Sequence, residues 1–303
     1  MVLRRWHAWQ TDGPWRDHLR TPRVLIHGRN QSRERNAMTA DLYAEYAFNN
    51  DVVEAKNQLQ YLSDTVDPHT FATLDSIGVA PGWECWDVGA GAGTVSHWLA
   101  ERVGVEGRVL ATDIKPQHIP AREGLNIARH DVRTDPFPTE TFDLIHARLL
   151  LMHLPTREQV VSQLVQALKP GGVLVISDWE TNYLDLILDS PDETGSRVFM
   201  RFLEICRAGS PLVGIDLRWA ARAHSVMRSA GLSDVTTTTH ASSWAGGTGA
   251  CVLHRSNTFQ LESRLLEDDF TEEELRTLRG VLLDPRFVIS SYLMFTTLGR
   301  RAQ

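Results

Sequence analysis

Gly89, Gly91 and Gly93 occupy alternate positions in the segment DVGAGAG, residues 87–93. A buried strand is expected before this segment, and an amphipathic helix is expected to begin near Thr94. Glycine lets a ligand approach the backbone closely and tolerates a positive φ, and the first N–H groups of a helix have no partner within it. A strand, a glycine turn and a helix in this order predict a site where backbone groups bind a ligand. The alternative is a plain tight turn.

The spacing of these glycines differs from that of the turn that binds dinucleotides. That turn has the pattern G-x-G-x-x-G, and its third glycine would fall at the position of Thr94. Thr94 and the later segment LKPGG, residues 168–172, both disfavour a nicotinamide-dependent dehydrogenase.

Two further carboxylates follow expected strands. Asp113 ends a strand at residues 108–112, and Asp131 follows a strand at residues 126–129. A carboxylate in the first position can accept both hydroxyls of a ribose. The second, together with the backbone N–H of Val132, can pair with the edge of an adenine ring. Because ligands bind at the carboxyl ends of parallel strands, both acids fall at the edge where a nucleoside would lie.

Five segments in this order resemble the class I S-adenosylmethionine (SAM)-dependent methyltransferases, over residues 43–232. They are WDVGAGAG, ATD, HDV, FDLIHARLLLMHL and LKPGGVLVISDW. The resemblance implies SAM as cofactor and an α/β fold with a Rossmann-like, seven-stranded, mostly parallel sheet whose last strand is antiparallel. It also implies an N-terminal helical lid and an inserted helical cap. YAFN at residues 46–49 and the chain end from LDP to GRR, residues 283–301, most resemble small-molecule methyltransferases of bacterial secondary metabolism.

The resemblance implies a set of cofactor-binding residues around the glycine turn and the strand ends. Asp87 either fixes the turn or meets the methionine ammonium group through water. Arg148, after the fourth strand, either anchors a substrate carboxylate or pairs with a neighbouring acid. The candidates are Asp87, Gly89, Ala90, Gly91, Gly93, Asp113, Ile114, Asp131, Val132 and Arg148.

Methyl transfer from a sulfonium is an in-line displacement, so the catalyst must hold nucleophile, methyl carbon and sulfur collinear in a dry pocket. His153 could act as a base, or it could close a turn as a structural residue. Glu180, after the fifth strand, could orient a hydroxyl or take a proton, or it could be a solvated loop acid. Tyr46, on the N-terminal helix with Tyr43, could stack on the acceptor, or it could pack as an ordinary apolar residue.

The chain is expected to have three parts. Residues 1–37 hold eight Arg against three acids and lack periodicity, which favours a disordered extension or a start-site artefact. Residues 38–80 are expected to form the helical lid, with a break at Pro68. Residues 81–303 are expected to form the SAM-binding core, with cap insertions near residues 181–214 and 245–285.

Charge and composition exclude several functions. The net charge is −7 and no basic face is apparent, so a nucleic-acid partner is not expected. The three Cys residues lack metal-ligand spacing, so no metal site is expected. No apolar run reaches the roughly 18 residues that span a bilayer, so we expect a cytoplasmic protein without a membrane partner. The expected partner is a small-molecule substrate, and an N-terminal helix exchanged between subunits could form a homodimer.

Three functions are compatible with the sequence. The leading one is SAM-dependent methylation of a small molecule at oxygen, nitrogen or carbon. The second keeps SAM bound while the pocket catalyses a rearrangement without methyl transfer. The third is a non-catalytic scaffold, which the intact glycine turn and strand-end acids disfavour.

Overall fold

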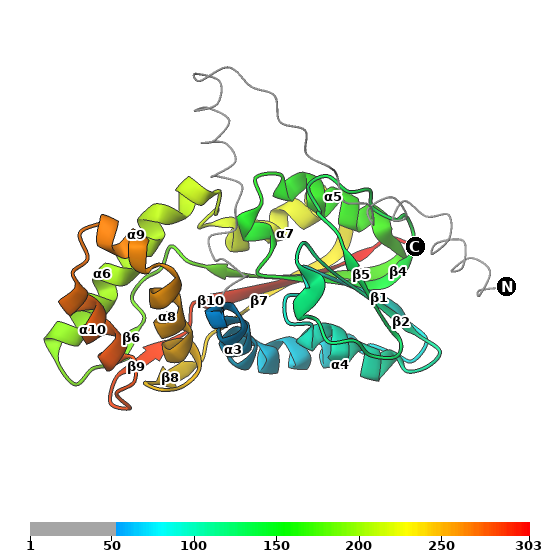
Figure 1. Ribbon diagram of the computed structural model, residues 1–303. Coiled ribbons are helices and arrows are strands. Elements are labelled where there is room, and N and C mark those ends of the chain that lie inside the picture. The colour runs from blue at the N-terminus through cyan, green and yellow to red at the C-terminus, as the bar shows by residue number, and fades with distance from the viewer. Residues whose placement is uncertain (1–52) are drawn as a thin grey trace, which may run out of the picture. The chain divides into compact units, whose positions relative to one another are not determined.

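The computed structural model describes residues 53–303. Its central sheet is formed by β1 (Glu84–Val88), β2 (Arg108–Asp113), β3 (Leu125–Arg129), β4 (Phe142–Arg148), β5 (Leu168–Glu180), β7 (Leu232–His240) and β10 (Leu293–Arg301). The strand order is β3-β2-β1-β4-β5-β10-β7 (Figure 1). Strands β1 to β5 pair in parallel, and β10 pairs antiparallel with both of its neighbours. The predicted seven-stranded, mostly parallel sheet is confirmed, and so is its antiparallel last strand.

Helices cover both faces of this sheet. Helices α3 (Val53–Ile77) and α4 (Thr94–Val103) lie on one face, and α5 (Arg157–Ala167) and α7 (Trp219–Ser229) lie on the other (Figure 1). The sequence of α4 explains its position. Val95, Leu99 and Val103 recur at helical spacing, and all three are buried in one apolar cluster with Val109 of β2.

Helix α3 runs through Pro68 without interruption, so the predicted break at this residue is wrong. Proline inside a helix removes one hydrogen bond and costs about 3 kcal/mol or more. Packing on both sides of the proline outweighs this cost. Val66 and Leu74 are buried, and the helix packs against both α4 and the cap helix α8 (Gly249–Gln260).

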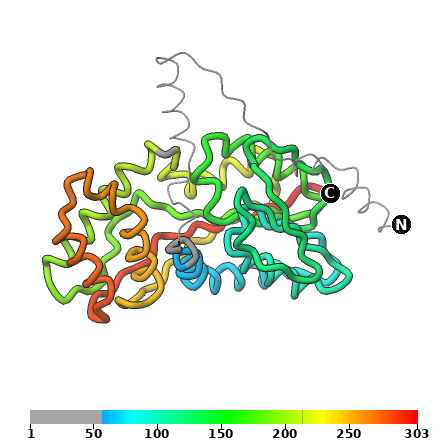
Figure 2. Tube along the Cα trace, in the orientation of Figure 1, coloured from blue at the N-terminus to red at the C-terminus, as the bar shows by residue number. Residues whose placement is uncertain are grey.

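A second group of elements forms a cap next to the sheet. Its elements are β6 (Ile187–Asp189), α6 (Glu193–Gly209), β8 (Ser243–Ala245), α8, α9 (Glu262–Glu267), α10 (Glu272–Val281) and β9 (Val288–Ser290). Figure 2 shows residues from the two predicted insertions, near 181–214 and 245–285, lying together, and they share one apolar core. The antiparallel sheet β6-β9-β8 was not predicted. Helix α10 begins with a capping box formed by Thr271 and Glu274.

Some predictions fall on residues that the structure does not describe. They concern Tyr43, Tyr46 and residues 1–37. Between residues 53 and 303, no helix combines the length and the apolar composition needed to cross a membrane.

Candidate functional site

The glycine turn follows β1 and is fastened to the end of β2. The N–H groups of Gly89 and Ala90 donate to the carbonyl oxygen of Thr112, at 2.8 and 2.9 Å. The N–H of Gly91 donates to Oδ2 of Asp113 at 3.0 Å. The structure thus brings the glycine turn and the Asp113 carboxylate together at one edge of the sheet.

Two positions of the turn admit no side chain. Gly93 has φ +78°, and a Cβ there would lie 2.6 Å from Cγ2 of Ile119. Gly89 has φ +69°, and a Cβ there would lie 3.1 Å from the δ carbons of Leu150. Both glycines are therefore required by the backbone conformation and by the packing beneath the turn.

Asp87 lies in β1, one residue before the strand ends, and is only 2% exposed. Its Oδ2 accepts a hydrogen bond from Oγ of Ser96 at 2.5 Å, and its Oδ1 lies 2.8 Å from Nδ1 of His146. Asp87 therefore ties β1 to α4 and to β4. These contacts hold the strand before the glycine turn in place, and they give His146 a structural role.

The Asp113 carboxylate accepts a second backbone hydrogen bond, from the N–H of Lys115 to Oδ1 at 2.9 Å. Each carboxylate oxygen has two lone pairs, so with respect to residues 53–303 one acceptor position remains on each after these bonds. The next residue, Ile114, is apolar yet 42% exposed. A hydrogen-bond acceptor and an exposed apolar surface thus stand side by side at the end of β2.

Asp131 is held by its neighbour Arg133. The guanidinium Nε and Nη2 lie 2.9 and 2.7 Å from Oδ1 and Oδ2, and the Arg133 N–H also donates to Oδ1. The side-chain hydrogen bond from Arg133 lowers the pKa of Asp131, so the carboxylate is ionised. The ion pair fixes Asp131, and with it the position of Val132, at the end of β3. The sequence analysis did not identify Arg133.

Arg148 connects the end of β4 to α3. Its Nη2 lies 2.8 Å from Oδ1 of Asp67, and its Nη1 donates to Oγ1 of Thr70 at 2.8 Å. The same Asp67 oxygen accepts a hydrogen bond from Oγ1 of Thr94, the first residue of α4. Of the two contacts considered for Arg148, the structure shows the pair with a neighbouring acid. Asp67 thereby holds α3 beside the glycine turn.

A cavity of about 480 Å³ lies beside the carboxyl ends of β4 and β5. Its walls come from α3, α6, α8, α9 and the segment after β4. Side chains such as Leu59, Leu62, Trp179, Phe202 and Tyr292 give it a largely apolar and aromatic lining. A cavity of this volume and lining is typical of small-molecule sites.

Three amide side chains join the two helices on either side of this cavity. Gln260 donates from Nε2 to Oε1 of Gln58 at 2.8 Å, and Gln58 donates from Nε2 to Oδ1 of Asn257 at 2.7 Å. Gln58 belongs to α3, and the other two belong to α8. All three line the cavity, so its polar wall is a hydrogen-bonded chain between the helix over the glycine turn and the cap.

Of the two candidate catalytic residues that the structure describes, one lines this cavity and the other does not. His153 lines it, and burial beside Arg157 lowers the pKa of His153 to about 4, so its imidazole is neutral near pH 7. Glu180 is not among the residues that line this cavity, whereas its neighbours Trp179 and Thr181 are. Alternate residues of an extended chain point to opposite sides, which explains this division. Glu180 accepts a hydrogen bond from the N–H of Asn182 instead.

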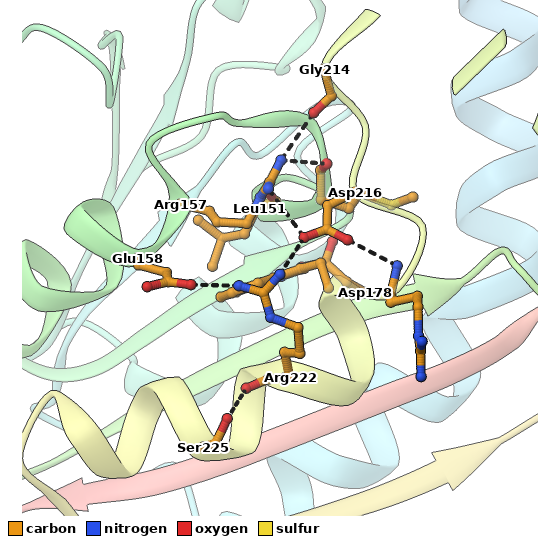
Figure 3. Close-up of polar contacts among 11 residues, drawn as sticks. Leu151, Arg157, Glu158, Asp178, Gly214, Asp216, Arg222 and Ser225 are labelled. Atoms are coloured by element: carbon orange, nitrogen blue, oxygen red, sulfur yellow. Dashed lines mark hydrogen bonds and ion pairs between the residues drawn. The ribbon is translucent and has the colours of Figure 1, made fainter. Parts of the chain in front are cut away.

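Arg157 supports the short turn that carries His153 (Figure 3). Its guanidinium donates to the carbonyl oxygens of Leu151 and Gly214, at 3.1 and 2.9 Å, and pairs with Asp216 at 3.2 Å. Asp216 is also paired with Arg222 of α7 at 2.8 Å. These contacts fix the turn after β4 against the chain that leaves the cap. No local pattern of residues indicates these contacts, because the partners are distant along the chain.

Asp178 lies beneath this network and is 1% exposed. Its Oδ2 accepts a hydrogen bond from Nε1 of Trp219 at 2.8 Å. Burial raises the pKa of Asp178 to about 7, although the Trp219 bond and the backbone N–H groups of Met152 and Leu150 act in the opposite direction. This side chain therefore joins β5 to α7 and to the segment after β4.

Comparison with known proteins gives a family match for part of the chain. Residues 86–176 match the family model described as a methyltransferase domain. The ubiquinone/menaquinone biosynthesis C-methyltransferase UbiE of Laribacter hongkongensis is 31% identical over 115 residues, which are 35% of this chain and 47% of that protein. Methyltransferase str2 of Strobilurus tenacellus is 34% identical over 140 residues, 44% of this chain and 49% of that protein. The chain spans about half the length of the curated relatives it matches.

Solved structures show the same fold. Phosphoethanolamine N-methyltransferase 2 of Haemonchus contortus, solved in complex with phosphomonomethylethanolamine and S-adenosylhomocysteine, aligns with a TM-score of 0.52 at 14% identity. The alignment covers 83% of this chain and 59% of that one. A second structure of that enzyme, in complex with SAM, aligns with a TM-score of 0.50 over 84% of this chain and 59% of that one, also at 14% identity. Because the sequence identity is only 14%, these structural alignments establish a shared fold and nothing further.

Proposed function

Since residues 86–176 are a methyltransferase domain within a sheet of the class I methyltransferase fold, we propose that this protein transfers a methyl group from SAM to a small-molecule acceptor. The cofactor lies along the glycine turn and the ends of β1, β2 and β3. The acceptor lies in the cavity of about 480 Å³ between α3 and the cap.

One observation carries this proposal: the glycine turn and the cavity share a wall. A Cβ on Gly91 would lie 3.7 Å from Cδ2 of Leu59, and Leu59 also lines the cavity. On the other side, Leu150 packs against Gly89 and its neighbour Leu149 lines the cavity. A methyl group presented at the turn would therefore face an acceptor in the cavity, with apolar side chains keeping water away.

The residues at the strand ends fit SAM. Asp113 can accept hydrogen bonds from the ribose hydroxyls, because its bonds within residues 53–303 leave an acceptor position on each oxygen, and Ile114 offers exposed apolar surface for the adenine ring. Asp131 and the N–H of Val132 would hold the adenine edge, and the side-chain-free glycine turn leaves room for the rest of the molecule. When bound, SAM supplies an electrophilic methyl group on a sulfonium sulfur.

The chain's own contribution to the reaction is mainly positioning. Trp179 and the apolar lining hold the acceptor in a dry site, where orientation can supply much of the rate enhancement. His153 is neutral, so its imidazole can accept the proton that an oxygen or nitrogen acceptor loses. Glu180 and Tyr46 remain further candidates for contact with the acceptor.

The names of the relatives support a small-molecule acceptor. They include the ubiquinone/menaquinone C-methyltransferase and a sterol 24-C-methyltransferase of Gibberella zeae, which is 28% identical over 119 residues. The sequence resemblance at residues 46–49 and 283–301 supports a place in bacterial secondary metabolism.

The test is transfer of label from SAM carrying a radioactive methyl group. The protein is incubated with this SAM and with small-molecule extracts of bacteria that make secondary metabolites, and the products are separated by chromatography. We expect label in a compound of low molecular mass. SAM binding with turnover of an extract compound but no label in any product would favour the rearrangement instead.

A further inference from the structure

His254 of α8 is a wall residue of the cavity that the proposed reaction does not use. It lines the cavity and is only 5% exposed. Aromatic rings surround it: its ring centroid lies 5.4 Å from that of Phe199, 5.9 Å from that of Phe202 and 5.6 Å from that of Tyr292, each with near-perpendicular planes. A polar side chain is thus set among apolar rings at the cap side of the cavity.

Among residues 53–303, His254 makes no hydrogen bond through its ring nitrogens, and these nitrogens are open to the cavity rather than fully buried. Burial lowers the pKa of His254 to about 4, so the ring is neutral and offers one N–H donor and one nitrogen acceptor. A donor and an acceptor that face an apolar cavity are satisfied only by what the cavity holds. By contrast, the amides of Gln58 and Asn257 in the same cavity are hydrogen-bonded to each other. The unmatched imidazole is therefore a place where a bound molecule gains a hydrogen bond.

A row of rings connects this imidazole with the end of β5. The Trp179 centroid lies 5.7 Å from that of Tyr292, which in turn lies beside His254. Trp179 stands at the strand end, where the methyl group would be delivered. The row gives the cavity two distinct ends, with aromatic surface between them that suits a flat apolar molecule.

We propose that the acceptor is an elongated aromatic molecule whose hydroxyl or carbonyl group, remote from the methylated atom, is bound by His254. His254 is then a specificity-determining residue, and the atom that receives the methyl group lies at the Trp179 end. This inference rests on the proposed function, because it takes the cavity as the acceptor site.

The experiment uses two probes of equal shape, 4-phenylphenol and 4-methylbiphenyl, which differ only in the hydroxyl. Their binding to the full chain is followed by quenching of tryptophan fluorescence, without SAM. We expect about a fivefold to tenfold preference for 4-phenylphenol, the size of one net hydrogen bond. In His254→Phe, which keeps an aromatic ring, the preference disappears while 4-methylbiphenyl binds as before. His224 of α7 does not line the cavity, so His224→Phe is the matched control and keeps the preference.

A second measurement does not depend on a variant. In protein labelled with ¹⁵N-histidine, we expect the NMR chemical shifts of the His254 ring nitrogens to change on addition of 4-phenylphenol and not on addition of 4-methylbiphenyl. Equal affinity of the wild type for both probes, absence of binding, or a preference that survives His254→Phe would overturn the proposal. Calorimetric titration with SAM reports on the cofactor site separately, so failure here is distinguishable from failure of the proposed function.

Discussion

Arg148 at the end of β4 and Asp67 in the middle of α3 form an ion pair of 2.8 Å, and their side chains are only 11% and 14% exposed. The pair joins the sheet to the helix whose Leu59 lies over the glycine turn. The pair therefore lies between the glycine turn, which we propose as the cofactor site, and the cavity that we propose for the acceptor.

Asp67→Asn is expected to lower the free energy of unfolding by about 2–3 kcal/mol, because it leaves the Arg148 guanidinium without a counter-charge in a nearly buried position. The same helix provides the control. Asp75 pairs with Arg102 at 2.9 Å, but both side chains are about half exposed, so Asp75→Asn is expected to change stability by about 0.5 kcal/mol or less. Urea unfolding measures both. Equal losses of unfolding free energy in the two variants would mean that the buried Asp67–Arg148 pair contributes no more stability than the exposed Asp75–Arg102 pair.

Gly93→Ala is expected to destabilise the fold by about 2–4 kcal/mol, because the new Cβ would meet Ile119 in a backbone conformation that alanine rarely adopts. Gly214 has a similar backbone conformation, with φ +83° and ψ 6° against +78° and 12° at Gly93, and a Cβ there would make only ordinary contacts of 3.7 Å or more. Gly214→Ala therefore introduces the backbone strain alone, and we expect the smaller loss there, about 1–2 kcal/mol. Thermal and urea unfolding of both variants measure the difference. A Gly93 variant as stable as the Gly214 variant would show that Ile119 gives way without cost.

Asp178 is expected to make stability depend on pH. Its pKa is about 7 in the folded protein and near 3.8 in an unfolded chain, so between these values the folded state binds a proton that the unfolded state has lost. The contribution of Asp178 is therefore full below about pH 4 and is lost as the pH rises to 7, by up to about 1.4 kcal/mol per pH unit. Asp178→Asn removes this titration and keeps an acceptor for Trp219.

Unfolding of wild type and Asp178→Asn is compared between pH 4.5 and 8. Other titrating groups are common to both proteins, so the difference isolates Asp178. We expect the wild type to lose stability relative to the variant as the pH rises. A constant difference would mean that the carboxyl titrates at its ordinary pKa.

Asp113→Ala is expected to weaken SAM binding by about 1–3 kcal/mol, the size of a lost charge-assisted contact. Asp143 is the control, because its carboxylate pairs with Lys169 at 2.6 Å near the opposite end of the sheet. Asp143→Ala should leave the affinity for SAM unchanged. Calorimetry measures both variants, and an unaltered affinity in Asp113→Ala would show that the ribose is held elsewhere.

The sheet and the glycine turn could be predicted because their signals are local. Helix α4 begins at Thr94, as predicted, since its apolar residues recur at helical spacing between two glycines, Gly93 and Gly104. The continuity of α3 through Pro68 could not be predicted, because packing against α4 and α8 overrides the local preference of proline. The small sheet of the cap joins three short strands from distant parts of the chain.

The site was predictable at the strand ends and less so in the cavity. Asp113 lies at the glycine turn because the topology of a parallel sheet brings strand ends to one edge. The partner of Arg148 could not be chosen from the sequence, because Asp67 meets it only in the folded chain. His254 gave no signal, since only the arrangement of α8 with the aromatic cluster places it in the cavity wall.

Calorimetric titration of the full chain with SAM and with S-adenosylhomocysteine tests the central claim most directly. We predict one site per chain with a dissociation constant in the micromolar range for both compounds, because the groups at the strand ends contact the nucleoside that both share. A folded sample that binds neither compound would contradict the assignment of the glycine turn as a SAM site and would favour a scaffold.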